Sequence, residues 1–288
     1  MKEIPVLAVI GGSGLYEFED ITDIETVEVS TPFGAPSSPI TIGRINGKKV
    51  AFLARHGIGH TFSPSDVPYR ANIYALKSLG IKRVVSVSAC GSLREAYAPG
   101  HIVIPDQIFD FTNKRERSFF GKGLVAHVSV AEPFCKALSD TLEEAVKANN
   151  VLYHRGGTYI TIEGPRFSTK GESRLYRQWG LDIIGMTASP EVFLAREAEM
   201  CYTTMAHVTD YDVWHVNEAA VTVEMVVETL KKNIELAQNT IRTMVDLIDP
   251  EADCGCEDAL STALITNPNA IDPEKRKELD LLVGKYLD

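Results

Sequence analysis

The chain has no long hydrophobic run. None of its apolar segments approaches the roughly 20 residues that a membrane-spanning helix needs, and the N-terminal stretch Met1–Val6 has no apolar secretory core. Of its 288 residues, 44% are hydrophobic and 24% are charged, which is typical of soluble globular proteins. We therefore expect a cytoplasmic protein without a membrane partner.

Positive charge is also in short supply. The chain has 29 Lys and Arg residues against 39 Asp and Glu residues, and its formal net charge is −10. Such a balance argues against nucleic acid or an anionic membrane surface as the main partner. Any anionic ligand must be held by a local site, because the overall field repels it.

Cysteine is infrequent and odd in number. An odd set of five scattered thiols does not form a secreted disulfide framework. Cys90, Cys135 and Cys201 are expected to be buried small hydrophobic residues. Cys254 and Cys256, one residue apart, indicate redox or metal chemistry, but the sequence shows no second Cys or His cluster that would complete a zinc site. We therefore expect no metal.

Apolar and β-branched runs alternate with segments of helical spacing along the whole chain. Strands are expected at 5–10, 40–45, 49–54, 83–89, 101–105, 157–162, 182–184 and 200–208, with a hairpin turn at Asn46-Gly47. Helices are expected at 68–79, 132–149, 169–179, 189–199, 221–247, 257–266 and 273–286. This alternation predicts an α/β fold with a largely parallel or mixed sheet. No linker or repeat marks a boundary, so residues 1–288 are expected to form a single domain with a helical tail over about 250–288.

Polar or small residues follow several of the expected strands. The loop Gly11–Leu15 could bring backbone N–H groups and the Ser13 hydroxyl to an anion, or it could be a plain turn. Arg55 and His56 suit a phosphate group, although an exposed charged turn has the same composition. The small residues Ser88 and Ala89 allow either close approach to a ligand or tight packing.

Two later strand ends carry an aromatic ring and a hydroxyl group. Phe167, after the strand 157–162, could stack on a flat ring or belong to the core. Met186 and Thr187 follow the strand 182–184, where Met would pack and Thr could meet a ligand. His60 and His127 could be surface or core residues.

Asp210 and Asp212 end the apolar run 200–208 and are the strongest signal in the chain. Side chains two residues apart on a strand point the same way, and ligands of α/β proteins bind at the carboxyl ends of strands. Such a carboxylate pair could hold a proton donor, a ring nitrogen or a metal. Convergence of all these strand ends at one edge of a sheet would make one binding site.

The motifs that carry these residues occur together in a recognisable order. They are GGSGL (11–15), LARHG (53–57), SACGSLRE (88–95), DQIFD (106–110), AEPFC (131–135), TIEGPRFS (161–168), GMTASPE (185–191) and TDYDVW (209–214). As a set, over about residues 5–230, the chain resembles the trimeric class of purine nucleoside phosphorylases, and within it the members that act on methylthioadenosine.

The resemblance implies a fold, a reaction and an assembly. The fold would be a single-domain nucleoside phosphorylase-like α/β fold, with a central mixed β-sheet or distorted barrel flanked by helices. The reaction would be phosphorolysis of methylthioadenosine to adenine and methylthioribose 1-phosphate, with inorganic phosphate as co-substrate and no metal or organic cofactor. The active unit would be a homotrimer or a pair of trimers.

The resemblance also assigns roles to residues. Phosphate would be bound by Ser13, Arg55, His56, Ser88, Ala89 and Thr187. The ribose would lie on Met186, and the purine between Phe167 and the loop that carries Asp210 and Asp212. Positions that set specificity for the methylthio end of the substrate would be Ser168, Val223, Val227, His60 and His127, the last from a neighbouring subunit.

Asp210 would act as the general acid at purine N7, and Asp212 would accept a hydrogen bond from the 6-amino group. Members that use 6-oxopurines carry Asn at the position of Asp210, so the Asp favours adenine. The alternative within the family is a phosphorylase for 6-oxopurine nucleosides or methylthioinosine. Outside it, a metal-dependent hydrolase using Glu163 with the two aspartates and a non-catalytic nucleoside sensor are further hypotheses.

Some positions depart from the family pattern. Ser13 and Ser88 replace the more usual Thr, and Gly185 stands where animal members have Asn. The pair Cys254 and Cys256 resembles a Cys-X-Cys that forms disulfides in some microbial members. In a mesophilic cytosol we expect free thiols.

Overall fold

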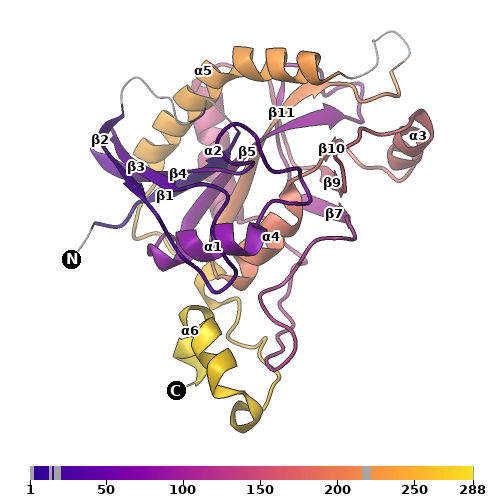
Figure 1. Ribbon diagram of the computed structural model, residues 1–288. Coiled ribbons are helices and arrows are strands. Elements are labelled where there is room, and N and C mark those ends of the chain that lie inside the picture. Colours follow the sequence, from indigo (N-terminus) through magenta and orange to yellow (C-terminus); the bar gives the residue numbers. More distant parts are fainter. Residues whose placement is uncertain (1–2, 13–14, 16–20, 216–221, 288) are drawn as a thin grey trace.

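The computed structural model describes residues 3–12, 15, 21–215 and 222–287. Its centre is a mixed sheet of eleven strands (Figure 1). The strands are β1 (Leu7–Gly11), β2 (Thr22–Val27), β3 (Ile40–Ile45), β4 (Lys48–Ala54), β5 (Arg83–Ser92), β6 (Ile102–Ile104), β7 (Gln107–Phe111), β8 (Tyr153–Arg155), β9 (Thr158–Ile162), β10 (Ile183–Gly185) and β11 (Cys201–Asp210). The α/β prediction is therefore confirmed.

The strand pairing leaves the sheet open. The order is β2-β3-β4-β1-β5-β10-β9-β7, while β11 pairs with β5 and with β6, which in turn pairs with β8. In the described part of the chain β2, β7 and β8 each have one partner strand and form edges. The mixed sheet is thus confirmed, and the distorted-barrel alternative is wrong because no pairing closes the sheet.

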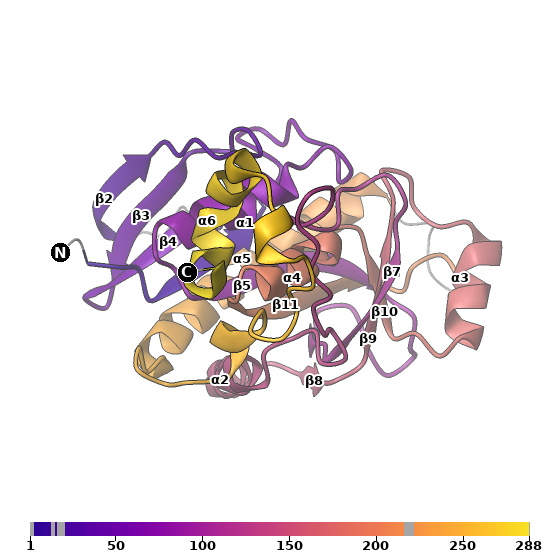
Figure 2. The same cartoon turned by 90° about the horizontal axis from the view of Figure 1, so that it is seen from below.

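Helices cover both faces of this sheet (Figures 1 and 2). They are α1 (Tyr69–Ser78), α2 (Lys136–Ala148), α3 (Lys170–Gln178), α4 (Ala188–Glu197), α5 (Val223–Leu247) and α6 (Pro273–Leu287), with the short 3-10 helices η1 (Cys256–Asp258) and η2 (Pro268–Ala270). None of the helices that the structure describes is both long and apolar enough to cross a membrane.

Alternate side chains of β1 pack into two different hydrophobic clusters, one on each face of the sheet. Ala8 and Ile10 pack in a cluster with residues of α1, α4 and α6, whereas Leu7 and Val9 pack with residues of α2 and α5. Successive side chains of a strand point to opposite faces of the sheet, so a fully apolar strand such as β1 serves both faces. The first cluster also draws the C-terminal helix α6 onto the body of the protein.

Most expected elements are present, with two kinds of error. Asn46 and Gly47 adopt positive φ angles of 51° and 79° in the predicted hairpin turn. The helix expected at 257–266 is wrong: only η1 and a run of turns form there. The strands β2, β7 and β8 were not predicted, because β2 is largely exposed, β8 has three residues, and the half-exposed β7 lies at an edge.

Two sets of strands meet along the end of β5. β1 and β11 each pair with β5 in parallel, and β4 pairs with β1 in parallel. The carboxyl ends of these four strands therefore lie at the same edge of the sheet. β10 runs in the opposite direction and pairs with β5 only at Gly91 and Ser92. Because β5 extends past its parallel neighbours, the end of β10 also arrives beside residues 88–91.

Candidate active site

The carboxylates of Asp210 and Asp212 lie against the end of β5. Asp210 is the last residue of β11 and pairs with Gly91, after an irregularity in the register beyond Val208. A Cβ atom at Gly91 would lie 2.9 Å from Asp210 Oδ1 and 3.3 Å from the Cβ of Asp212. Glycine at this position therefore makes room for the pair, which the structure brings together as the sequence predicts.

Asp210 is buried and locally hydrogen-bonded. Its Oδ2 accepts from the Thr209 hydroxyl and its Oδ1 accepts from the backbone N–H of Asp212, both at 2.7 Å. Burial raises the pKa of the Asp210 carboxyl, and these two hydrogen bonds offset only part of the effect. A carboxyl group with a raised pKa keeps its proton closer to neutral pH, which is what a general acid needs.

Asp212 presents a buried acceptor near the hydroxyl groups of Ser173 and Ser168. Its Oδ2 is buried and has no hydrogen-bond partner among the described residues. Burial raises the pKa of Asp212 to about 6, with the nearby Asp210 carboxylate adding to the shift and the Ser173 hydroxyl opposing it. A buried acceptor without a partner costs free energy, so a ligand that donates a hydrogen bond here would be bound strongly.

Arg55 follows β4 and is buried in an ion pair that the sequence did not reveal. Its Nε and Nη2 donate to the two carboxylate oxygens of Glu191 at 2.8 and 2.9 Å, and Tyr202 donates to the same carboxylate at 2.7 Å. Nη2 also donates to Ser86 Oγ at 2.6 Å. Nη1 donates to the Val87 carbonyl at 3.3 Å, which occupies one of its two hydrogens.

These contacts change the role expected of Arg55. Its side chain is 2% exposed and its charge is neutralised by Glu191, which is fully buried. The alternative of an exposed charged turn is wrong. Arg55 fixes the end of β4 against β5 and α4, and one of its two Nη1 hydrogens has no acceptor among the described residues.

His56 and His60 stack beside this ion pair, with ring centroids 4.3 Å apart. The Phe62 carbonyl accepts from Nδ1 of His56 over 3.0 Å. Burial and the neighbouring Arg55 charge lower the pKa of His56 to about 4, so its ring is neutral at pH 7 and Nε2 is an acceptor. A neutral His56 can accept the O–H of a protonated phosphate through Nε2.

Ser88, Ala89 and Thr187 lie where β5 and β10 run past each other. Ser88 and Thr187 are buried, whereas Ala89 is half-buried within an otherwise buried stretch of strand. Thr187 precedes α4, and its hydroxyl makes no capping hydrogen bond to that helix. Ser189 has non-helical backbone angles (φ −100°, ψ 137°), so the regular part of α4 begins after it, and the Thr187 hydroxyl is the group that could bind an anion.

Tyr159 is a buried residue of β9 that the sequence did not single out. A Cβ atom at Gly185 would collide with the Tyr159 hydroxyl, which has no hydrogen-bond partner in the described part of the chain. The Tyr159 ring therefore occupies the space of the side chain that Gly185 lacks. No signal in the sequence connects the two positions, because they are joined only by the pairing of β9 with β10.

Phe167, Ser168 and Met186 are all half-buried at the ends of β9 and β10. A Cβ atom at Gly164, where φ is +68°, would lie 2.7 Å from the sulfur of Met186. The loop after β9 thus packs directly on Met186, and only glycine fits the contact. The Ser168 hydroxyl is buried without a partner among the described residues.

Arg115 joins these two strand ends and is the main residue that the sequence failed to indicate. It donates to the carbonyl oxygens of Met186, Ser189 and Glu163 at 2.6 to 2.7 Å. It also contacts the Glu163 carboxylate at 3.3 Å. Its position in the charged run 114–117 suggests an exposed loop, which concealed its burial.

Glu163 is occupied by protein partners. Burial alone would raise its pKa, but the Ser65 hydroxyl, the backbone N–H groups of Asn113 and Lys114, and the Arg115 charge lower it to about 2. Its carboxylate therefore anchors the loop 113–115 to the end of β9. This arrangement does not fit the metal-dependent hydrolase hypothesis, in which Glu163 was a ligand.

Three of the remaining predicted residues, Ser13, Val223 and Val227, have side chains outside the described part of the chain, and the fourth, His127, lies elsewhere. Ser13 lies outside the described residues. Val223 and Val227 lie in the first two turns of α5. His127 is exposed, and its backbone N–H donates to the Ala263 carbonyl at 2.9 Å in the C-terminal segment.

One expectation about the cysteines is wrong. Cys254 and Cys256 do have a matching cluster, since Cys135 and Cys201 lie beside them in the structure. The sequence could not show this, because the start of α2, the start of β11 and the segment after α5 meet only in the folded chain.

The site can therefore offer three things to a ligand. One end has hydroxyl groups and a neutral imidazole, which suit an anion. The other end has a carboxyl group of raised pKa and a buried carboxylate acceptor without a partner among the described residues. Between them lie the aromatic Phe167 and the thioether Met186, which suit a ring and an apolar sugar face.

Comparison with known proteins gives consistent matches. Residues 6–246 match the family model described as the phosphorylase superfamily. An S-methyl-5'-thioadenosine phosphorylase of Geobacter sulfurreducens is 50% identical over 283 residues, which cover 98% of this chain and 99% of the relative.

Solved structures agree with the sequence matches. A methylthioadenosine phosphorylase from an antarctic soil metagenomic library has a TM-score of 0.93 at 48% identity, covering 98% of this chain and 99% of that one. The methylthioadenosine phosphorylase of Schistosoma mansoni in complex with adenine has a TM-score of 0.83 at 37% identity, covering 89% and 96% of the two chains.

Proposed function

The chain belongs to the phosphorylase superfamily, and we propose that it cleaves S-methyl-5'-thioadenosine with phosphate. The products are adenine and 5-methylthioribose 1-phosphate. The observation that carries the substrate choice is the buried pair Asp210 and Asp212, because it combines a carboxyl group of raised pKa with an acceptor that has no partner. The relatives of about 50% identity bear the same activity in their names.

Asp210 acts on the leaving base. Cleavage of the glycosidic bond gives the sugar oxocarbenium character and leaves negative charge on the purine. The proton of the Asp210 carboxyl moves to N7 and neutralises that charge. Thr209 and the Asp212 N–H then stabilise the Asp210 carboxylate that remains, through the hydrogen bonds already described.

Asp212 selects the base. Its Oδ2 accepts a hydrogen bond from the 6-amino group of adenine. A 6-oxopurine would place an oxygen lone pair against the same carboxylate and leave the buried acceptor without a donor, which disfavours that class of base. Phe167 stacks on the purine, and Met186 supports the ribose.

Phosphate is the nucleophile and the counter-charge of the sugar cation. Ser88, Ala89 and Thr187 offer hydroxyl and backbone groups at the crossing of β5 and β10, with Ser13 completing the set. His56 accepts the phosphate O–H and Arg55 gives its remaining N–H. No metal takes part in this chemistry.

We further propose that the active unit is a homotrimer, or a pair of trimers. Exposed aromatic residues form a continuous group at one end of the sheet: Phe109, Phe111 and Trp179 contact one another and are 39–48% exposed. Such a patch favours an interface between subunits. His127 would then reach the methylthio end of a neighbouring site, with His60, Ser168, Val223 and Val227 as its other specificity residues.

The decisive experiment measures adenine release from methylthioadenosine with and without phosphate. We expect release only with phosphate, with methylthioribose 1-phosphate formed in equal amount, and no change in initial rate on adding EDTA. Inosine and methylthioinosine are the matched 6-oxopurine substrates and should react poorly. Release without phosphate, or restoration of an EDTA-inhibited rate by Mg²⁺, would refute the proposal.

A further inference from the structure

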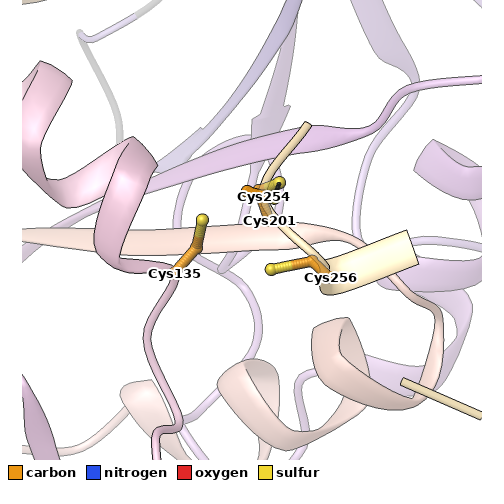
Figure 3. Close-up of side chains that lie close together, drawn as sticks. All are labelled: Cys135, Cys201, Cys254 and Cys256. Atoms are coloured by element: carbon orange, nitrogen blue, oxygen red, sulfur yellow. Dashed lines mark hydrogen bonds between the residues drawn. The ribbon is translucent and has the colours of Figure 1, made fainter. Parts of the chain in front are cut away.

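Four of the five cysteines converge far from the proposed active site. The Sγ atoms of Cys135, Cys201, Cys254 and Cys256 all lie within 4.8 Å of one another (Figure 3). Three of these side chains are buried and Cys254 is half-buried, and none of the five cysteines is in a disulfide. Four thiols around one point are the ligand set of a tetrahedral metal site.

The local backbone holds the four thiols in place from three segments. Cys135 precedes α2, and its backbone N–H donates to the carbonyl of Tyr202, the residue after Cys201 in β11, at 2.8 Å. Gly255 adopts a left-handed conformation with φ of 69° between Cys254 and Cys256. This turn directs both thiols toward the same space, although they are separated by one residue only.

The buried guanidinium group of Arg83 fixes the position of the segment that leads to Cys254 and Cys256. Arg83, at the start of β5, donates from Nη2 to the carbonyl oxygens of Asp249, Pro250 and Ala252 at 2.9 to 3.1 Å. The segment that leads to Cys254 is therefore anchored on the sheet before it reaches the other thiols. The fold itself therefore positions the four thiols close together.

The surroundings favour negative charge on sulfur. Cys135 is the N-cap of α2, and its Sγ accepts from the Leu138 N–H at 3.4 Å, at the positive end of the helix dipole. Arg196 donates from Nη1 to Cys256 Sγ at 3.5 Å. A site of four thiolates with a divalent cation carries two negative charges, which this helix end and this guanidinium partly balance.

We propose that Cys135, Cys201, Cys254 and Cys256 bind one structural Zn²⁺ ion as four thiolates. Zinc takes four sulfur ligands at about 2.3 Å, which places the sulfur atoms about 3.8 Å apart, within the observed range of separations. Binding displaces one proton from each thiol to solvent, and no electron is transferred. With all four positions filled by protein, the ion is structural and has no open position for catalysis.

Disulfide formation is the competing chemistry at this place. The sulfur atoms of Cys201 and Cys254 are 2.7 Å apart, between the about 2.05 Å of a disulfide and the spacing in a zinc site. A disulfide joins sulfurs in pairs, whereas here each sulfur has three others within reach. This mutual arrangement favours a shared central ion.

The ion would secure the C-terminal segment to the sheet. Residues 257–264 continue from Cys256 to the bridge between Leu264 and Ala126, next to the hydrogen bond that joins His127 and Ala263. The zinc site therefore supports the loop that carries His127, in addition to α6. Its loss should lower thermal stability without removing any group that contacts substrate.

The test measures metal content in the full-length protein purified with zinc and a phosphine reductant. We expect about one zinc per chain by mass spectrometry of the metal, and about four thiols that react with a mercurial only as zinc is released. Cys254→Ser and Cys256→Ser should each lose the zinc. Cys90→Ala is the matched control, because Cys90 is the cysteine outside the cluster, and it should keep the zinc.

Cobalt gives a second readout that requires no variant. Purified protein stripped of zinc and titrated with Co²⁺ should show the visible absorption bands of tetrahedral cobalt thiolate, with an end point at one ion per chain. This result supports the proposal even if the serine variants fail to fold. Zinc-free protein with all thiols reactive, or a mass loss of two hydrogens for each disulfide under non-reducing conditions, would overturn it.

Discussion

At the scale of single residues, Asp210 has neighbours that accept a change to asparagine. In Asp210→Asn the amide oxygen would keep the hydrogen bond from the Asp212 N–H. The amide N–H₂ would donate to Thr209 Oγ1, whose own hydrogen would turn to the Cys90 carbonyl at 3.2 Å. We therefore expect a folded variant in which the chemistry alone is changed.

This variant should lose most of its activity on methylthioadenosine and shift toward 6-oxopurines. An amide can donate a hydrogen bond but cannot transfer a proton to N7, and loss of a general acid lowers the rate by a factor of roughly 10²–10⁴. The amide can donate to the O6 and N7 acceptors of a 6-oxopurine. The measurement is the ratio of kcat/KM for methylthioadenosine to that for methylthioinosine. An unchanged ratio would show that Asp210 does not face the base.

The buried Asp212 carboxylate lowers the stability of the folded protein at pH 7, although it is the group proposed to select the base. Folding raises the pKa of Asp212 from 3.8 to about 6. Between these pH values the folded protein binds more protons than the unfolded chain, so the free energy of unfolding falls as pH rises, and the contribution of Asp212 is lost as pH rises through about 6. The shift corresponds to about 3 kcal/mol at pH 7. Asp212→Asn removes that cost, so the variant should be more stable than the parent at pH 7 and equally stable near pH 3.5.

The comparison is made by urea unfolding at both pH values. Asp246→Asn is the matched control, since Asp246 is exposed and accepts a bond from Asn46 that an amide oxygen preserves. It should change the free energy of unfolding little at either pH. A stability gain in Asp212→Asn that is equal at the two pH values would exclude ionisation as its cause. Its discrimination against methylthioinosine should also weaken.

At the scale of elements, Arg115 connects the ends of β9 and β10 to the start of α4. Arg115→Lys would leave several of its carbonyl partners unpaired, because an ammonium group cannot reach Met186, Ser189 and Glu163 at once. We expect a loss on the order of 3 kcal/mol in stability. Because Met186 and Phe167 shift with these strand ends, KM for the nucleoside should rise more than KM for phosphate.

Arg117 supplies the control for Arg115. It lies two residues further along the same charged run, and its ion pair with Asp110 is partly exposed at 2.9 Å. Arg117→Lys should change stability by no more than about 0.5 kcal/mol. If the two variants behave alike, the connection made by Arg115 does not position the substrate.

The same elements show how far sequence reasoning reaches. Hydrophobic periodicity predicted the strands and helices that bury apolar faces, and the residues at their ends were sufficient to predict the pair Asp210 and Asp212. Arg115, Glu191 and Tyr159 were not predicted. The cited contacts of Arg115 and Glu191 join residues 48 to 136 positions apart, and Tyr159 meets Gly185 only through the pairing of β9 with β10. Long-range partners of buried polar groups leave no local signature in one sequence.

The C-terminal region shows the same limit. Its turns 259–266 resemble an amphipathic helix in spacing, but the segment is held by contacts with Val125 and His127 of a distant loop. The cysteine cluster was missed for a related reason, because Cys135, Cys201 and the pair Cys254 and Cys256 lie in three segments that are more than 50 residues apart along the chain. Local periodicity cannot show which distant segments meet.

At the scale of the whole molecule, one chain does not bring His127 to the proposed site. His127 is exposed and lies beside the C-terminal segment, so its expected role in the methylthio pocket requires a neighbouring subunit. A cyclic trimer provides that contact once per site, because each subunit presents one surface to one neighbour and a different surface to the other. Light scattering should give a mass of three chains, or six.

Shared sites predict recovery of activity in mixed assemblies. A chain with Asp210→Asn has no functional site of its own but carries an intact His127. A chain with His127→Glu has an intact base site but places a carboxylate at the methylthio pocket of its neighbour. In trimers formed by co-expressing the two chains at equal levels, about a quarter of the sites would combine an intact base site with an intact His127. Such mixtures should exceed the activity of either variant alone.

The control mixes chains with Asp210→Asn and chains with Phe167→Ala. Both positions belong to the part of the site that a single chain supplies. Every site in those trimers takes both positions from one chain, so each carries one defect or the other and activity should not recover. Because His127 is exposed in the single chain, its replacement has little reason to affect folding, and low activity of the His127→Glu trimer reports on the neighbour's pocket. Equal recovery in both mixtures, or full activity in a species with the mass of one chain, would mean that the site is complete within one subunit.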